Sequence, residues 1–572
     1  MAYGSKDQKL KAEQKAQDII KKSTKAFTTS ERMNVEATWS LLAEFILPNA
    51  NGGFFGDTSK GVRKDRRVFS SVGSQANRDL ASFLHATITN PAMEWSKLRF
   101  RSDVLNNDKD SVTWMQDSIK KVHVAFNESN LNSEIGEGYN SLSALGTMAL
   151  FHEEITGEDG QFEKFNFCTW HLSEIAFAEN QIGMVDTIYR KFTMTLKQLF
   201  EKFGSVIGTD LLDKLETSPL EEYHLIHAIY PRSIKDVKYS AEGVALPMNR
   251  PWASCYVLCK GQKLLKEDGY YEFPVYVPRW STLPAEIYGY GPGHTALSDI
   301  RSLNKVWEEG LKALAKSVNP PIFSTKQNMF TADLRPGKIN QVRDVNQIKE
   351  FVTNSRLDLL QFAMENLSMT IKSAFYIDKL LLPPRTETGE MTAYEVAQRL
   401  EQLQQILGPV VSRFNDELLT PLIMRSIKIL QRNGVIGAYP TKIVEVAKMV
   451  GTKAIDVEII FVNSLARSQQ MSELRNVQTW LQETAMMAQG LGPEVLDLID
   501  KDEVIAYMAK IRGIPEQMLR SDQDVAATRE QRNQQMAQQQ MLQAGEQVGN
   551  IVGKVGPVLN NAQANSTTEA KK

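Results

Sequence analysis

The stretch that decides the fold runs from Ala285 to Phe323 and reads AEIYGYGPGHTALSDIRSLNKVWEEGLKALAKSVNPPIF. Three glycines open it, a helical repeat occupies residues 295–318, and two consecutive prolines follow. At about 100° per residue, apolar side chains cover most of that helix and the charged ones share a narrow arc. A helix with so little polar surface is expected to pack among several others. The stretch therefore predicts one long helix of a multi-helix arrangement.

The charged arc of this helix mixes both signs. Its basic members lie within roughly 60° of one another, and two glutamates share their side. The residues are Arg301, Lys305, Lys312, Lys316, Glu308 and Glu309. Glu308 precedes Lys312 by four positions, the order that favours an ion pair on a helix. A buried bundle helix with ion pairs along its polar edge explains the pattern as well as a binding surface does, so both interpretations stay open.

The glycines at 289, 291 and 293 precede a helix, as glycines do in dinucleotide-binding loops. The later glycine of that motif is missing, a proline intervenes, and no strand–helix–strand unit follows. We therefore expect a tight strand-to-helix turn in which these glycines supply positive φ angles.

The part of the chain before this stretch divides into zones. Residues 1–26 are rich in lysine and are expected to form a solvated helical arm, and residues 30–159 have helical spacing. Residues 160–290 alternate between β-branched or aromatic runs and turns, with one helix opened by the capping-box pair Thr195 and Gln198. The expected strands are Phe162–Trp170, Gly183–Thr193, Tyr223–Tyr230, Trp252–Cys259 and Tyr271–Val277. The fold class is therefore α+β and predominantly helical.

Beyond the two prolines the chain alternates between helices and loops. A short β insert precedes a second helix from about Gln347 to Phe375, and the proline- and glycine-rich LLLPPRTETGEM follows at 380–391. Farther along, a strand at 456–462 precedes more helices. The stretch from Gly545 is small and polar, and we expect it to be disordered.

A very long helix is expected between that loop and that strand. Thr392 and Glu395 form a capping box at its start, and one apolar stripe continues to Ile427. Pro409 and Pro421 lie inside it, where proline should kink the helix, because the apolar spacing resumes on both sides.

Charge and cysteine content exclude several classes of protein. The 572 residues hold 66 Lys and Arg against 68 Asp and Glu, a net charge of −2, which excludes a polycation that binds nucleic acid through total charge. The longest uncharged run, Gly138–His152, is too short for a transmembrane helix, and the charged N-terminus is unlike a secretory signal. Three cysteines fit a reducing compartment, and Cys255 and Cys259 lack the further ligands of a zinc site.

No pattern of catalytic residues is visible in the sequence. It has no phosphate-binding P-loop, no G-x-S-x-G and no Cys–His nucleophile signature. His224 and His227 lie on an expected strand, where an odd separation points them to opposite faces and prevents them from sharing a metal. His152 and the glutamates after it have the composition of a solvated acidic turn. We therefore expect neither an enzyme nor a cofactor or metal site.

Five segments in collinear order resemble one known family. They are the opening stretch, LHATITNPAMEWSKLRF (84–100), VDTIYRKFTMTLKQLFEKFG (185–204), EYHLIHAIYPR (222–232) and MTAYEVAQRLEQLQQILGPVVSRFNDELLTPLI (391–423). Together they resemble the head-to-tail connector, or portal, proteins of short-tailed (podovirus, T7-like) bacteriophages, over roughly residues 30–530.

This resemblance implies a ring of twelve subunits at one capsid vertex, around an axial channel for DNA. Each subunit would have wing, stem, clip and crown regions. The implied boundaries are 1–294 for the helical arm and α+β wing, 295–318 for the first stem helix, 319–350 for the clip, 351–376 for the second stem helix, 377–391 for a tunnel loop, 392–463 for the long kinked wing helix and strand, 464–545 for a helical crown and 546–572 for a disordered tail.

The resemblance also implies a set of partners and a location. The partners are double-stranded DNA in the channel, the terminase large subunit that packages it, a tail adaptor, and the major capsid and scaffolding proteins, with no membrane. The protein would belong to the virion at the head–tail junction, and to the host cytoplasm during assembly.

Repetition around a ring constrains the charges of such a channel. One lysine becomes a ring of positive charge, and affinity for DNA rises with each phosphate neutralised. We therefore expect a mostly neutral or acidic wall with a few cationic rings. The candidates are Lys379 and Arg385 of the tunnel loop and, if their stripe faces inward, Lys305, Lys312 and Lys316. Candidates for contact with terminase or adaptor are Lys326, Arg335, Lys338 and Arg343 of the clip.

Two other hypotheses stay open on the sequence alone. A different ring or scaffold component of the virion, such as a tail adaptor or a minor capsid protein, would share the absence of catalytic motifs. It would have a shorter chain without the paired helices. An enzyme of unrecognised type would need titratable residues that converge on a pocket, and the sequence shows no such cluster.

Overall fold

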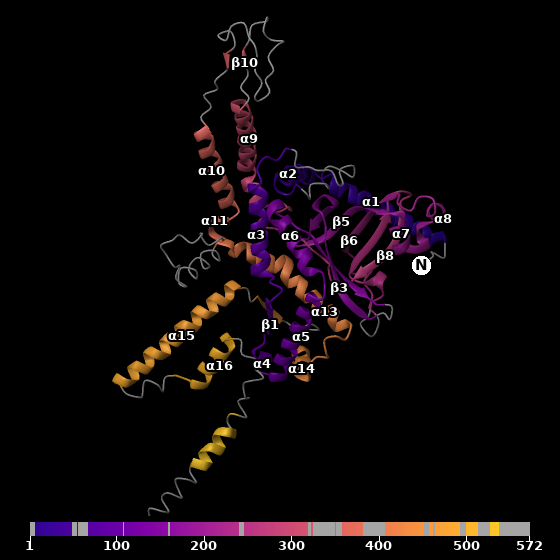
Figure 1. The fold of residues 1–572 in the computed structure, drawn as a ribbon. Helices are drawn as coiled ribbons and strands as arrows, with labels where there is room; N and C mark the ends of the chain where they lie inside the picture. The colour runs from indigo at the N-terminus through magenta and orange to yellow at the C-terminus, as the bar shows by residue number, and fades with distance from the viewer. Residues whose placement is uncertain are drawn as a thin grey trace, which may run out of the picture. The chain divides into compact units, whose positions relative to one another are not determined.

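The computed structural model describes most of the chain in two compact units, and each unit is described here by itself. The first comprises residues 1–99, 115–439 and 457–468, and the second comprises residues 100–114, 440–456 and 469–572. The described residues, drawn as coloured ribbon in Figure 1, are 6–48, 54, 67–106, 108–157, 161–239, 245–318, 322–323, 349–350, 357–380, 406–450, 457–461, 464–491, 499–512, 525 and 527–536.

A five-stranded antiparallel sheet forms one part of the first unit. Its order is β4-β5-β6-β7-β8, so strands adjacent in the chain are adjacent in the sheet. The strands are β4 (Ile175–Glu179), β5 (Val185–Thr195), β6 (Glu222–Pro231), β7 (Trp252–Leu258) and β8 (Lys263–Tyr270). The predicted strands at β5, β6 and β7 are confirmed. The prediction missed β4, which is short, and β8, whose sequence KLLKEDGY is too charged to resemble a strand.

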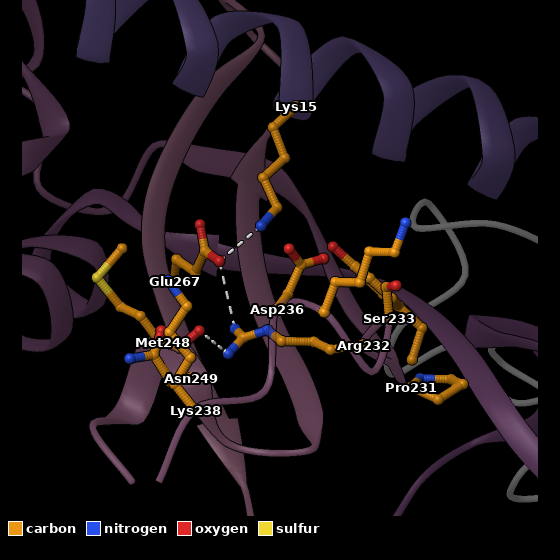
Figure 2. Close-up of a pocket in the computed structure, with 11 residues that line it drawn as sticks. Lys15, Pro231, Arg232, Ser233, Asp236, Lys238, Met248, Asn249 and Glu267 are labelled. Atoms are coloured by element: carbon orange, nitrogen blue, oxygen red, sulfur yellow. Dashed lines mark hydrogen bonds and ion pairs between the residues drawn. The ribbon is translucent and has the colours of Figure 1, made fainter. Parts of the chain in front are cut away.

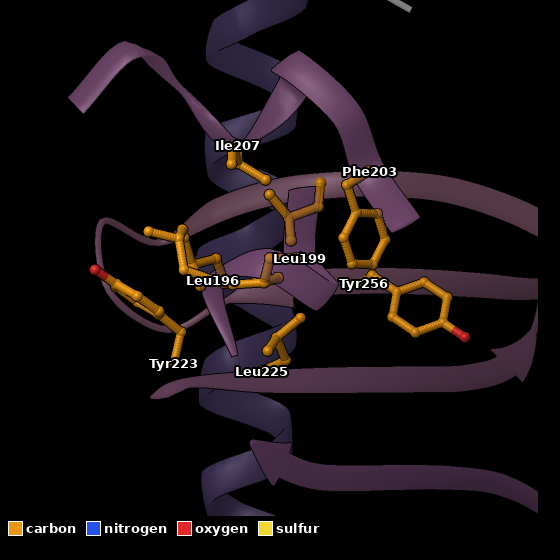
Figure 3. Close-up of a cluster of buried hydrophobic side chains, with 9 residues drawn as sticks. Leu196, Leu199, Phe203, Ile207, Tyr223, Leu225 and Tyr256 are labelled. Atoms are coloured by element: carbon orange, nitrogen blue, oxygen red, sulfur yellow. The ribbon is translucent and has the colours of Figure 1, made fainter. Parts of the chain in front are cut away.

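One face of this sheet is covered by α7 (Leu196–Phe203). The predicted capping box opens α7: the Thr195 amide donates to Gln198 Oε1 at 3.1 Å, and the Gln198 amide donates to Thr195 Oγ1 at 3.4 Å. Leucine and aromatic side chains of the helix pack on the sheet, as Figure 3 shows. The buried cluster comprises Leu196, Leu199, Phe203, Ile207, Tyr223, Leu225, Tyr256, Leu258 and Leu265.

The opposite face of the sheet is covered by α1 (Lys6–Phe27). Ala16 and Ile19 of α1 are buried against Ile226, Val257 and other side chains that alternate along the strands with those beneath α7. The prediction of a solvated arm at residues 1–26 is therefore wrong. Its lysines lie on one side of an amphipathic helix, and the alanine and isoleucine stripe on the other side belongs to the core.

A second, three-stranded sheet has the order β3-β2-β9. Its strands are β2 (Leu150–Thr156), β3 (Phe162–Thr169) and β9 (Val275–Tyr276). β3 confirms a predicted strand, whereas the strand predicted at 271–277 shrinks to the two residues of β9. β2 lies at the end of the zone that was expected to be helical.

The acidic turn expected at His152 is part of strand β2. His152 is fully buried, and its Nδ1 lies 2.9 Å from the Tyr276 hydroxyl on β9. The prediction of a solvated turn was wrong because the apolar residues of the strand, Leu150 and Phe151, precede the polar ones and pair with β3 and β9.

Helices form most of the rest of the first unit. The first of them are α2 (Ser30–Ile46), α3 (Val72–Ile88), α5 (Lys109–Asn127), which begins in the second unit, and α6 (Leu131–Leu145). Trp39 of α2 is fully buried and its indole Nε1 donates to the Leu145 carbonyl at 2.9 Å. The short strand β1 (Ser96–Phe100), which the helical spacing did not predict, pairs with β12 (Val457–Phe461), which confirms the strand expected at 456–462.

The three glycines of the opening stretch lie against the end of α6. A Cβ on Gly289 would lie 2.2 Å from the Gly146 carbonyl oxygen, and one on Gly293 would lie 2.2 Å from the Ala144 carbonyl oxygen. Positive φ angles were expected at positions 289, 291 and 293, but the glycine with positive φ at this contact is Gly146, at 74°. That expectation was wrong: the glycines are required because two backbones approach closely, not because the turn is left-handed.

The long helix predicted from Thr392 is described from residue 406 onward, and its first residues lie outside the described part of the chain. Helix continues past Pro409 and ends at Arg432, the last residue of α13 (Thr420–Arg432). Between these points Asn415–Leu419 forms a π-helical turn. Pro421 has no amide hydrogen to donate to the carbonyl four residues earlier, that of Glu417, and the wider turn accommodates this missing bond.

The second unit is helical in its described residues. It contains α4 (Asp103–Asn106), α14 (Thr441–Val450), most of α15 (Ser464–Leu491), α16 (Lys501–Arg512) and a helical stretch at 527–536. Lys442 Nζ pairs with Asp108 Oδ1 at 2.9 Å. The hydrogen bond from Ser111, with that from Lys442, lowers the pKa of Asp108. The tail expected to be disordered from residue 546 lies outside the described residues.

Candidate functional site

The opening stretch forms half of a helical hairpin. α9 (Pro292–Val318) includes the whole helix predicted at 295–318, and α10 (Leu357–Ala374) runs antiparallel beside it, as Figure 1 shows. Gly310 makes the close approach possible, because a Cβ there would lie 2.9 Å from Cδ2 of Leu360 and 3.1 Å from Cε of Met364. At the far end of the hairpin, β10 (Ile322–Phe323) pairs antiparallel with β11 (Lys349–Glu350).

The start predicted for the second helix was too early. Lys349 and Glu350 belong to β11, residues 351–356 are outside the described part of the chain, and α10 begins at Leu357. The four clip candidates, Lys326, Arg335, Lys338 and Arg343, also lie outside the described residues, so their roles stay predictions.

Both helices of the hairpin leave large apolar side chains in solvent. The exposed fractions are 37% for Trp307, 44% for Leu311 and 50% for Leu314 on α9, and 54% for Leu359, 64% for Phe362 and 61% for Met369 on α10. Ile300 and Leu303, nearer the start of α9, are buried. Each helix of the hairpin therefore has an apolar face that the described residues of the single chain do not cover, and exposed apolar patches of this kind often mark interaction sites.

The charged arc of α9 is an ion-pair network. Lys305 Nζ lies 2.9 Å from carboxylate oxygens of both Glu308 and Glu309, and Lys312 Nζ lies 2.6 and 3.2 Å from them. The i,i+4 pair predicted between Glu308 and Lys312 is confirmed. Hydrogen bonds within the network raise the pKa of both lysines and lower the pKa of both glutamates. Two positive and two negative charges cancel locally, and all four stay ionised at neutral pH.

Lys379, a tunnel-loop candidate, lies on a short helix. The segment 377–391 was expected to be a loop throughout, but Ile377–Leu380 forms α11. Ile377, the first residue of α11, is buried, while Lys379 stays exposed. Lys379 Nζ lies 6.0 Å from the centre of the Tyr376 ring. Arg385 lies outside the described residues, as does the side chain of Lys316.

A buried arginine lies at the base of the hairpin. Arg279 Nη2 donates to Glu417 Oε1 at 2.6 Å and to the Gly183 carbonyl at 3.1 Å, and Nη1 pairs with Glu179. Burial alone would lower the pKa of Arg279, but the hydrogen bonds and charges of Glu417 and Glu179 outweigh it and raise that pKa. Glu417 belongs to the π-helical turn, so Arg279 joins this turn to the β4–β5 connection.

The sequence interpretation did not include Arg279, Trp280 or Glu417. Glu417 follows Asn415 and Asp416, beside the apolar stripe that contains Phe414 and Leu418. Because a polar residue is ordinary at such a position, the sequence contains no signal that Glu417 is buried against Arg279.

A polar cavity between α1 and the sheet, shown in Figure 2, brings another arginine and a lysine to one carboxylate. Lys15 Nζ lies 2.6 Å from Glu267 Oε1, and Arg232 Nη2 lies 3.2 Å from the same oxygen. Arg232 also donates to backbone carbonyls of residues 247, 248, 250 and 268. Because its polar groups are engaged with the protein itself, this cluster fastens α1 and the β6–β7 connection to β8.

Two further findings concern the described residues. None of their His, Cys, Asp and Glu side chains form a group of three that could hold a metal ion. None of the helices in these ranges is long and apolar enough to cross a membrane.

The two histidines of β6 lie on opposite faces of that strand, as predicted. His227 is buried with Nε2 2.9 Å from Ser254 Oγ, and His224 faces the other side of β6.

Comparison with known proteins identifies the family. A family model described as bacteriophage head to tail connecting protein matches residues 18–519. The chain belongs to this family. It is 27% identical to the probable portal protein of Bordetella phage BPP-1 over 554 residues, which cover 94% of this chain and 96% of that one. It is 26% identical to the portal protein of Salmonella phage epsilon15 over 528 residues, or 90% and 91% of the two chains.

A third relative shows how far the similarity extends. The portal protein of Escherichia phage T7 matches half of each chain, with 27% identity over 302 residues. The resemblance inferred from the five segments is thus confirmed: this is a portal-family head–tail connector, a virion component at the head–tail junction. Its portal relatives are structural phage proteins and are not known enzymes.

Proposed function

We propose that copies of this chain close into a twelve-subunit ring, and that the hairpins of α9 and α10 line the channel through which double-stranded DNA enters and leaves the capsid. The observation that supports this most directly is the pair of uncovered apolar faces. Trp307, Leu311 and Leu314 lie on one helix, and Phe362 and Met369 lie on the other. Two different faces that cover each other between neighbouring copies make a head-to-tail contact, which closes into a ring when the rotation between copies brings the last copy onto the first.

Single charges on either face test the ring. We expect Leu311→Asp or Phe362→Asp to give a folded chain that no longer forms rings, because the carboxylate would be buried in the contact without a partner. Leu220→Asp is the matched control, since Leu220 is 76% exposed and outside the hairpin. Sedimentation velocity and negative-stain microscopy measure assembly, and circular dichroism verifies folding.

Mixing the two monomeric variants sharpens this experiment. The Leu311→Asp chain keeps an intact α10 face and the Phe362→Asp chain keeps an intact α9 face. A head-to-tail contact therefore predicts that an equimolar mixture forms dimers and nothing larger. Rings from either variant alone, or a wild-type chain that is a monomer under every condition, would contradict the proposal.

The ion-pair network of α9 suits a channel that DNA must cross without adhering. Repeated in twelve copies, an unpaired lysine would hold phosphates, whereas Lys305 and Lys312 are each balanced by glutamates. We propose that exposed Lys379, with Arg385, supplies the cationic rings, and that the clip docks the terminase large subunit during packaging and the tail adaptor afterwards. The wing and crown would contact major capsid and scaffolding proteins while the particle assembles in the host cytoplasm.

Capsids assembled with variant portals test these assignments. Replacing Lys379 and Arg385 by alanine is expected to change the packaging rate and DNA retention, and charge reversal of Lys338 and Arg343 is expected to weaken recruitment of terminase and adaptor. DNA protected from nuclease and the co-sedimentation of each partner are the measurements. Wild-type values for both variants would rule out these residues as contacts.

A further inference from the structure

The residues at 279–282 contact both ends of one long chain segment. That segment is 377–413, of which the structure describes residues up to Leu380 and from 406 onward; its N-terminal end is called the outgoing side and its C-terminal end the returning side. On the outgoing side, the Trp280 ring stacks on Tyr376, with the ring centres 6.4 Å apart and an angle of 17° between the planes. On the returning side, the same indole meets Phe414 edge-on, at 5.9 Å and 72°. One buried side chain therefore touches both ends.

The neighbours of Trp280 add polar contacts to two residues of the returning side, Glu417 and Arg413. Arg279 pairs with Glu417 through its guanidinium, and its backbone amide donates to Glu417 Oε2 at 2.8 Å. Arg413 Nη1 donates to Thr282 Oγ1 at 2.6 Å. The returning helix is thus held by an aromatic contact, an ion pair and a hydrogen bond within one turn. These three contacts determine its rotation as well as its distance.

The 279–282 stretch is itself fixed to the core of the first unit. The Trp280 amide donates to the Gly146 carbonyl at 2.9 Å, and Arg279 forms a β-bridge with Thr147. Trp280 is 5% exposed and Arg279 is 4% exposed. Since Gly146 is also the residue against which the glycines before α9 pack, the same point of the core holds the base of the hairpin.

The outgoing side carries a backbone conformation that needs support. Tyr376 has a φ of 61°, in the left-handed region that a residue with a side chain seldom adopts. It occupies the position just after a helix end where glycine is usual. Phe375 and Ile377 on either side are buried, and the tyrosine ring rests on Trp280. A residue keeps this unfavourable backbone conformation only where the surrounding structure holds it, so the contacts of Tyr376 fix the direction in which the chain leaves α10.

We propose that Arg279 and Trp280 are positioning residues that clamp both ends of the segment 377–413, fixing the chain at Tyr376 on one side and at Phe414 and Glu417 on the other. Because Trp280 touches both ends, its loss should loosen both, whereas the contacts of Glu417 hold the returning end alone. If the proposed channel exists, the clamp also sets where Lys379 stands relative to the DNA. That consequence rests on the proposed function, whereas the clamp itself does not.

Hydrogen–deuterium exchange on the full-length protein tests the clamp without requiring rings or DNA. We expect Trp280→Leu to speed amide exchange by about tenfold in both 375–380 and 406–414, while β5–β7 keep wild-type protection. Trp280→Phe keeps an aromatic ring and should retain most of the protection. Glu417→Gln removes the negative charge that pairs with Arg279 on the returning side alone, so exchange should rise in 406–414 and stay unchanged in 375–380.

Trp170→Leu is the matched control, because Trp170 is also buried but stacks on Phe151, away from the clamp. It should loosen its own surroundings and leave both ends of the segment protected. Unchanged exchange at either end in Trp280→Leu would overturn the proposal. So would equal loosening by Trp170→Leu, which would show a general loss of stability. A chain that forms no ring but shows the expected exchange would refute the channel and leave the clamp intact.

Discussion

Gly293 and Gly146 show how single residues without side chains hold the base of the hairpin. A Cβ on Gly293 would penetrate the Ala144 carbonyl, and one on Gly146 would lie 2.4 Å from the Gly289 carbonyl oxygen. These obstacles are backbone atoms, which cannot rotate away as a flexible side chain can. The sequence correctly indicated that the glycines matter, but their partner lies about 140 residues earlier in the chain, and no local pattern shows it.

Gly293→Ala is therefore expected to lower the free energy of unfolding by about 1–3 kcal/mol, the usual cost of overpacking a closely packed site. The midpoint of a urea unfolding curve measures this change. Gly136→Ala in α6 is the control, since nothing lies within 4 Å of its Cβ position. In a helix interior that substitution should be neutral or stabilise by up to about 1 kcal/mol. Equal midpoints for the two variants would contradict the close-contact explanation.

At the scale of elements, patterns with a short repeat were predicted well and patterns that depend on a distant partner were not. α9 and the capping box of α7 depend on residues three or four apart, and the sequence placed both correctly. β8 forms because it pairs with β7, although its own residues are mostly polar. The sequence predicts a solvated arm at α1, because its apolar stripe is short and the sheet that this stripe packs against lies far away in the chain.

The contribution of α1 can be measured with one substitution. Ile19 is 3% exposed against the sheet, so Ile19→Ala should lower the free energy of unfolding by about 2–4 kcal/mol, through lost burial and the cavity left behind. Leu10 on the same helix is 58% exposed, and Leu10→Ala should change the free energy of unfolding by less than about 0.5 kcal/mol. Thermal unfolding followed by circular dichroism compares them. A small effect of Ile19→Ala would contradict the packing of α1 on the sheet and would support the solvated arm expected from the sequence.

At the scale of the whole molecule, buried histidines link folding to pH. Burial lowers the pKa of His152 and His227 well below the ordinary value of 6.5, and lowers the pKa of His294 to about 4. The unfolded chain therefore binds protons at these residues near pH 6.5, whereas the folded chain binds them only at lower pH. The free energy of unfolding is at its full value above about pH 6.5 and decreases as the pH falls.

Urea unfolding at constant salt between pH 7.5 and about 5 measures this dependence, in a range above that of ordinary carboxylates. Each histidine that is neutral when folded contributes a slope of up to about 1.4 kcal/mol per pH unit once the unfolded chain is protonated. His294→Gln should reduce the slope by one such contribution. A stability that does not change, or that rises, as the pH falls through this window would contradict the buried neutral histidines.

The sequence by itself determined the family, the α+β class, the long helix of the opening stretch and the absence of a catalytic motif. Each of these depends on residue types at short spacing or in collinear order along the chain. The tertiary structure decided that α1 belongs to the core, that the glycines serve a backbone contact, and that Arg279 and Trp280 join both ends of one segment. Those features depend on residues far apart in the chain, because only folding brings a buried charge to its partner or one backbone against another.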